Sequence, residues 1–156
     1  MAKALSKKEI KEFTNVFREL NSLIQAFQEK NELAHAFKDI AIPPLLSESL
    51  ALHLLKEEII LPELAGYSFT RNQGADIVAA ALDGTKKKIE VKANGVKGFN
   101  RLGKKDIQAD YRMWIAFGSY FKNPDQSEFT VYTLPQPERF FPKPINQLPL
   151  TKFLKV

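Results

Sequence analysis

The chain has 156 residues, 44% of them hydrophobic, and a formal net charge of +5 at pH 7. This size suits one domain, residues 1–156, and argues against two independent domains. The sequence has no cysteine, which excludes disulfides, thiolate catalysis and Cys-ligated zinc. No window holds the ~20 apolar residues of a membrane-spanning helix, and no apolar run follows the lysines of residues 1–11. We therefore expect a cytoplasmic protein of the reducing intracellular compartment, with no membrane partner.

A long amphipathic helix is the first predicted element. Residues 6–9 have the form of a capping box, and apolar residues follow at spacings of 3 and 4. They are Ile10, Phe13, Phe17, Leu20, Ile24 and Phe27. The pattern predicts a helix over residues 7–28 or beyond, packed either on the chain's own core or on a second subunit. With a helical stretch at residues 31–40, it forms an N-terminal helical extension, residues 1–42.

A second helix and a group of strands follow. We expect this helix at residues 47–60, stopped by Pro62, and a short helix at residues 104–109. The strand-like runs lie at residues 67–71, 75–82, 86–93, 111–117 and 129–134. The proline-rich residues 135–156 are expected to form an irregular C-terminal wrap. This order predicts an α/β fold in which helices flank a mixed β-sheet.

A turn signal at Asp83-Gly84 separates two of these strands. A three-residue loop, residues 82–84, is a common hairpin connection when its glycine adopts the left-handed conformation. The register of such a hairpin places Asp76 directly opposite Glu90 on one face of the sheet. Opposed like charges destabilise a sheet, so we expect a cation between the two carboxylates.

Two carboxylates at this spacing form an oxygen-rich site of the kind that accepts Mg²⁺, or Mn²⁺ in its place. Lys92 stands two residues beyond Glu90, where it can orient a water and stabilise negative charge that develops at phosphorus. These groups meet the needs of phosphodiester hydrolysis. The alternative is that Glu90 and Lys92 face solvent in an amphipathic strand whose Ile89 and Val91 enter the core.

At these residues the sequence resembles the PD-(D/E)xK nuclease superfamily, and most of all its type II restriction endonucleases. Asp76, thirteen intervening residues and the run Glu90-x-Lys92 match the D…(D/E)xK pattern, although Ala75 replaces the usual proline. The resemblance covers residues 47–117, the expected catalytic core. It implies a restriction-endonuclease-like fold, catalysis by Asp76, Glu90 and Lys92, and a metal held by Asp76 and Glu90.

The resemblance extends to the helix before the hairpin. Superfamily members often carry an acidic residue there, and Glu48 occupies that place. The resemblance therefore implies a catalytic role for Glu48. The alternative is a glutamate in the first helical turn that interacts favourably with the helix dipole.

Positive charge gathers on the segment that holds the motif. Residues 86–112 carry nine basic and three acidic residues, whereas residues 1–60 carry eight and nine. A polyanion such as DNA docks on charge of this kind, and a solvated lysine face is the alternative. The candidate DNA contacts are Arg71, Asn72, Gln73, Lys97, Phe99, Asn100, Arg101, Lys104 and Lys105.

These features predict a Mg²⁺-dependent endonuclease that cuts double-stranded DNA at specific sequences, as a homodimer with one active site for each strand. A Holliday-junction resolvase and a homing nuclease are alternatives from the same superfamily. A nucleic-acid-binding module without catalysis is the alternative from another class. Other hydrolase designs find no support, because His35 and His53 lie on apolar helical stretches and no HExxH or Gly-rich phosphate loop occurs.

Overall fold

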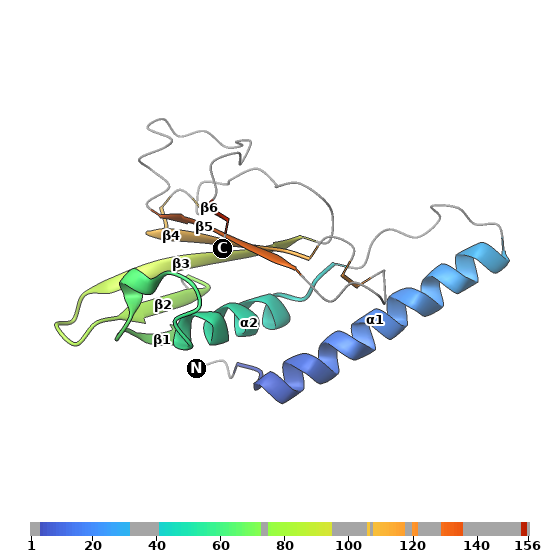
Figure 1. The fold of residues 1–156 in the computed structure, drawn as a ribbon, viewed down its shortest axis with the longest axis horizontal. Helices are drawn as coiled ribbons and strands as arrows, with labels where there is room; N and C mark the ends of the chain where they lie inside the picture. The colour runs from blue at the N-terminus through green and yellow to red at the C-terminus, as the bar shows by residue number, and fades with distance from the viewer. Residues whose placement is uncertain are drawn as a thin grey trace.

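A computed structural model describes residues 4–31, 41–72, 75–94, 106, 108–117, 120–121, 129–135 and 154–155. Helices and strands combine in a mixed α/β fold (Figure 1). The helical elements are α1 (Lys7–Lys30), α2 (Pro44–Lys56) and the short 3₁₀ helix η1 (Pro62–Leu64). The strands are β1 (Ser68–Arg71), β2 (Ile77–Ala80), β3 (Lys86–Asn94), β4 (Tyr111–Ala116), β5 (Thr130–Pro135) and β6 (Leu154–Lys155).

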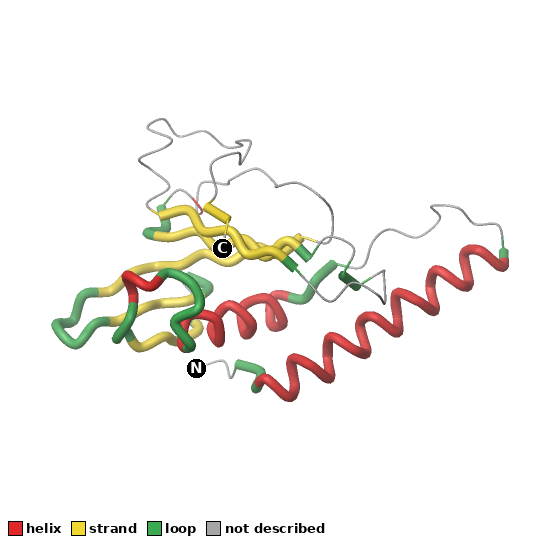
Figure 2. The backbone as a smooth tube through the Cα atoms, viewed as in Figure 1, coloured by secondary structure: helices red, strands yellow, loops and turns green. Residues whose placement is uncertain are grey.

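The strands form one six-stranded sheet in the order β1-β2-β3-β4-β5-β6. Neighbouring strands are antiparallel except for β3 and β4, which run parallel. The predicted mixed sheet is therefore confirmed. Figure 2 shows α1 and α2 on the same side of the strands, so the helices form one layer and the sheet another.

Helix α1 begins with the predicted capping box. The Ser6 hydroxyl accepts a hydrogen bond from the Glu9 N–H at 3.2 Å, and the Glu9 carboxylate accepts one from the Ser6 N–H at 2.8 Å. The apolar positions of α1 do not share one environment, because Phe17 is buried whereas Phe13 and Leu20 are exposed. Figure 1 shows that the later part of α1 extends past the end of α2.

Helix α2 starts three residues before the predicted range 47–60 and ends four residues before its end. The proline at its start is favourable, because the first helical position needs no backbone N–H donor. The chain leaves the helix at Glu57 and turns at Glu58, which has a left-handed φ of 57°. Leu46, Ala51, Leu52 and Leu55 of α2 are buried. They pack into the core with the strands.

Alternation along the strands gives the sheet two faces. The face toward α2, called here the helix face, carries Ile77 of β2 and Ile89 and Val91 of β3, all buried in the core. The opposite face, called here the motif face, carries Glu90, which pairs in register with Arg112 of β4. The motif therefore lies on a strand whose other side anchors the core.

Other predictions concern segments at the margins of the fold. The wrap over residues 135–156 is not wholly irregular, because Leu154–Lys155 pairs with β5 as strand β6. Residues 32–40, most of the wrap, and residues 104, 105 and 107 of the predicted helix at 104–109 lie outside the described residues. Among the helices that the structure describes, none combines the length and apolar character needed to cross a bilayer.

Candidate functional site

The β2–β3 hairpin has the predicted register. Ile77 of β2 pairs with Ile89 of β3, and Gly84 in the connecting loop has a φ of +87°, the left-handed conformation that the turn requires. Continued by one position, this register sets Asp76 opposite Glu90. The turn residues thus decide which carboxylates meet, as a shift of one residue would send one of them to the other face.

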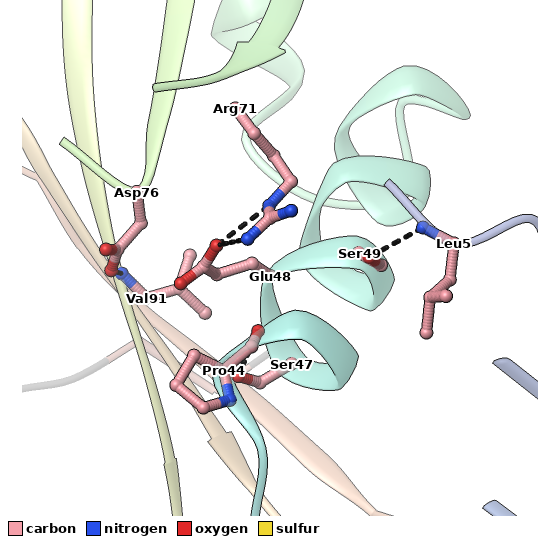
Figure 3. Close-up of polar contacts among 8 residues, drawn as sticks. All are labelled: Leu5, Pro44, Ser47, Glu48, Ser49, Arg71, Asp76 and Val91. Atoms are coloured by element: carbon pink, nitrogen blue, oxygen red, sulfur yellow. Dashed lines mark hydrogen bonds and ion pairs between the residues drawn. The ribbon is translucent and has the colours of Figure 1, made fainter. Parts of the chain in front are cut away.

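Asp76 is held where β2 and β3 separate. Strand β3 continues to Asn94, but its pairing with β2 ends at Ile89. Just beyond that pair, Oδ2 of Asp76 accepts a hydrogen bond from the Val91 N–H at 2.7 Å (Figure 3). Since a charged acceptor strengthens a hydrogen bond to a backbone N–H, this contact fixes Asp76 beside the motif strand.

Glu90 has an unusual electrostatic environment. Partial burial is the main reason that its pKa is raised to about 7, and the negative charges of Asp76 and Asp106 raise it further. Lys92 and Arg112 act in the opposite direction without cancelling the effect. A bound divalent cation would relieve this excess of negative charge, so the Asp76–Glu90 pair fits a hard metal ion such as Mg²⁺.

Glu48 reaches the same region from α2. Its Oε2 accepts hydrogen bonds from Nε and Nη2 of Arg71, at 2.8 and 2.5 Å, and both side chains are only 14% exposed. Figure 3 shows the Glu48 carboxylate directed from α2 toward the strands that carry Asp76 and Val91. Because α2 begins at Pro44, Glu48 lies beyond the first helical turn, so the helix-dipole alternative is wrong. Arg71, a predicted DNA contact, uses its guanidinium to bind Glu48.

Two charged residues that the sequence analysis did not single out lie on the motif face. Nη1 of Arg112 donates to Oδ1 of Asp106, and both residues are buried. Nζ of Lys92 lies 3.9 Å from the same Asp106 oxygen and is exposed. The charged residue within the apolar strand YRMWIA could have drawn attention to Arg112. No local signal marks Asp106.

Arg112 has more donors than the described residues satisfy. Its Nε and Nη2 are buried without a hydrogen bond to any described group. Burial lowers the pKa of this guanidinium, and the charge of Asp106 opposes the change. A buried ion pair of this kind holds its partners in place, because removing either one leaves an uncompensated charge in the interior.

Most of the other residues predicted to contact DNA lie outside the described part of the chain. Asn72 is exposed just after β1, and its N–H donates to the Asp76 carbonyl at 3.4 Å. Gln73, Lys97, Phe99, Asn100, Arg101, Lys104 and Lys105 lie outside the described residues, as does His35. His53 has a structural contact, since its Nε2 lies 2.9 Å from the Leu5 carbonyl.

No group of three or more His, Asp or Glu side chains arranged to hold a metal ion occurs in the described part of the chain. No known protein family, curated protein or solved structure matches the sequence or the fold. The contacts of Asp76, Glu90, Lys92 and Glu48 are therefore the support for a functional proposal.

Proposed function

We propose that the protein is a Mg²⁺-dependent endonuclease that hydrolyses phosphodiester bonds in double-stranded DNA. The observation that supports this most directly is the hairpin register, which sets Asp76 opposite Glu90 and puts Lys92 on the same face. The proposal includes a PD-(D/E)xK core. Asp76 at the separation of two strands, Glu90-x-Lys92 on the next strand and Glu48 on the preceding helix follow the order of that motif.

In this proposal Asp76 and Glu90 hold Mg²⁺, or Mn²⁺ in its place. When bound, the metal acts as a Lewis acid toward the scissile phosphate and lowers the pKa of its bound water. Lys92 is exposed on the motif face, 3.9 Å from Asp106, and its ammonium group orients the attacking water or stabilises negative charge on the phosphate. Glu48 supplies a further carboxylate on the α2 side of the site.

Double-stranded DNA is the proposed substrate because positive charge accompanies the motif. Lys86 and Lys88 are exposed on β3, the strand that also carries Glu90 and Lys92. Exposed lysines neutralise backbone phosphates and draw a polyanion toward the strand. We further propose site-specific cleavage like that of type II restriction enzymes, by a homodimer that offers one site to each strand.

The first experiment compares plasmid DNA with a synthetic four-way junction, each incubated with the protein in Mg²⁺ and in EDTA. We expect discrete cleavage of the plasmid in Mg²⁺ and none in EDTA. Cleavage of the junction alone would replace the proposal with a resolvase. Binding of both substrates without cleavage in Mg²⁺ or Mn²⁺ would leave only a nucleic-acid-binding module.

A further inference from the structure

Helix α1 presents a continuous apolar stripe that the described chain does not bury. The α1 stripe consists of Phe13, Val16, Leu20, Leu23 and Phe27, which are 37%, 64%, 42%, 63% and 52% exposed. Their spacings of 3 and 4 place them on one side of the helix. Five large apolar residues in one exposed row differ from the scattered apolar residues that an ordinary protein surface tolerates.

The helix is attached to the protein along one edge of the stripe, where Phe17 stacks on Phe13 with ring centroids 6.4 Å apart. Phe17 packs edge-to-face on Phe121, with ring centroids 4.8 Å apart. Nε of Arg18 donates to the Tyr120 carbonyl at 2.8 Å, and the Arg18 guanidinium lies 4.0 Å from the centre of the Tyr120 ring. These contacts orient α1 and leave the stripe directed outward. The exposure of the stripe is thus a property of the anchored helix.

The exposed area suits a subunit interface. With about 200 Å² for each large apolar residue, the five exposed fractions leave roughly 500 Å² of apolar surface. Two stripes face to face would bury roughly 1,000 Å², and flanking polar residues would bring the total into the range of about 1,200–2,000 Å² found in stable interfaces. A second copy of the chain therefore supplies a partner of the right area and polarity.

We propose that two copies of the chain pair through the α1 stripe, with the helices antiparallel about a two-fold axis. Glu12 and Lys30 border opposite ends of the stripe, four residues before Val16 and three after Phe27. Both are exposed. In the antiparallel arrangement, Glu12 approaches Lys30 of the partner subunit, and the symmetry repeats this contact.

The opposite orientation is less favourable. A parallel pair would keep Glu12 and Lys30 of the two subunits at opposite ends of the helices, 18 residues or roughly 27 Å apart, so it would lack this contact. The contact of Glu12 with Lys8, at 3.8 Å in the same helix, is an exposed pair of little energetic weight. When the two-fold axis of the antiparallel pair passes between Leu20 and Leu23, Val16 of one copy also packs against Phe27 of the partner subunit.

The pairing is inferred from α1 and does not rest on the proposed function. Its test uses the full chain without DNA or metal, so that its outcome is separate from that of the cleavage experiment. The mass in solution is measured by sedimentation equilibrium across micromolar concentrations. We expect a dimer for the unchanged protein, and a monomer at all these concentrations would overturn the proposal.

Substitutions locate the interface. In Val16→Glu/Leu23→Glu we expect the dimer dissociation constant to rise at least about 30-fold, the effect of losing an interface hot spot. The matched control is Leu82→Glu, because Leu82 is fully exposed in the β2–β3 loop and should leave the dimer unchanged. Circular dichroism verifies that each variant is folded. A folded stripe variant that dimerises as tightly as the control would overturn the inference.

A charge exchange tests the orientation of the helices. Glu12→Lys should weaken the dimer because it meets Lys30 of the partner subunit, and adding Lys30→Glu should restore the affinity. Restoration in the double variant is specific to the antiparallel arrangement. If Glu12→Lys leaves the affinity unchanged or tightens the dimer, or if the double variant fails to restore it, the proposed antiparallel geometry is wrong.

Discussion

The two sides of strand β3 compensate their acidic groups differently. Toward α2, Glu48 receives two hydrogen bonds from Arg71. On the motif face, Glu90 has a pKa raised to about 7 by burial and by neighbouring carboxylates. The protein therefore pairs the acid on the α2 side with its own donors and leaves negative charge in excess on the motif face.

This difference indicates on which side of β3 an added cation would stabilise the carboxylates most. A carboxylate that already has strong donors gains little from a further cation, whereas an electrostatically strained carboxylate gains more. Lys92 is exposed beside Glu90, but it also lies near Asp106, so its charge is shared. The motif face is thus the expected position of the proposed metal, and the Glu48–Arg71 pair would support it from α2.

The largest expected effect is on catalysis. Asp76→Ala and Lys92→Ala should each lower Mg²⁺-dependent cleavage at least about 100-fold, since each removes a group that acts on the reacting phosphate or its metal. Binding of DNA at low salt should persist. Rates of plasmid cleavage measure the effect, with Lys56→Ala, an exposed lysine at the end of α2, as the control. Cleavage retained by either site variant would remove that residue from the site.

The second prediction compares a buried ion pair with a partly exposed one. Arg112→Met should lower the free energy of unfolding by about 3–5 kcal/mol, because it leaves buried Asp106 without its guanidinium partner. Lys87→Met removes the ion pair in which Nζ of Lys87 lies 4.0 Å from Oδ1 of Asp110. It should lower the free energy of unfolding by about 1 kcal/mol or less. Urea unfolding measures both. Equal effects would contradict the structural role assigned to the Arg112–Asp106 pair.

The third prediction concerns the support from α2. A double-mutant cycle of Glu48→Gln and Arg71→Met should give a coupling free energy of about 1–2 kcal/mol, because the pair is doubly hydrogen-bonded and largely shielded from solvent. The exposed pair Lys7–Glu57 should show almost none. Glu48→Gln should also slow cleavage, but less than Asp76→Ala. Unchanged cleavage would confine Glu48 to a structural role.

The smallest effect is a dependence of stability on pH. The pKa of Glu90 in the folded protein, about 7, lies above its ordinary value of 4.5, so folding favours the protonated form. Its stabilising contribution is present below pH 4.5 and is lost as the pH rises through 7. Because Glu90 is only half-buried, we expect a loss of about 1 kcal/mol between pH 5 and 8 without metal.

The control for this prediction is Glu90→Gln, which cannot ionise. Its free energy of unfolding should lack the decline that the unchanged protein shows in EDTA. Added Mg²⁺ should reduce the decline in the unchanged protein, because the metal stabilises the ionised carboxylate. Parallel pH profiles for the two proteins would contradict the assignment of the shift to Glu90.

The hairpin could be predicted from sequence because its geometry is local. Asp83-Gly84 defines the turn, and the period of two along each strand then decides that Asp76 and Glu90 meet. The capping box of α1 is equally local. The start of α2 was harder to place, because Pro44 can end one helix or begin the next.

Contacts between distant segments could not be predicted in this way. The pairing of Glu48 with Arg71 joins residues 23 positions apart, and nothing in either local sequence specifies it. The periodicity of α1 shows that the helix has an apolar side but does not show that Phe17 is the residue it buries fully. Such contacts depend on how whole elements pack, which local patterns do not determine.

The position of Trp114 gives the protein a built-in optical probe. It is the single tryptophan of the chain, fully buried, and pairs in register with Lys92 across the parallel strands β3 and β4. Its ring also lies 5.3 Å from the Arg112 guanidinium carbon. Because indole emission responds to nearby charge, the fluorescence of Trp114 reports on events around Lys92 without any attached dye.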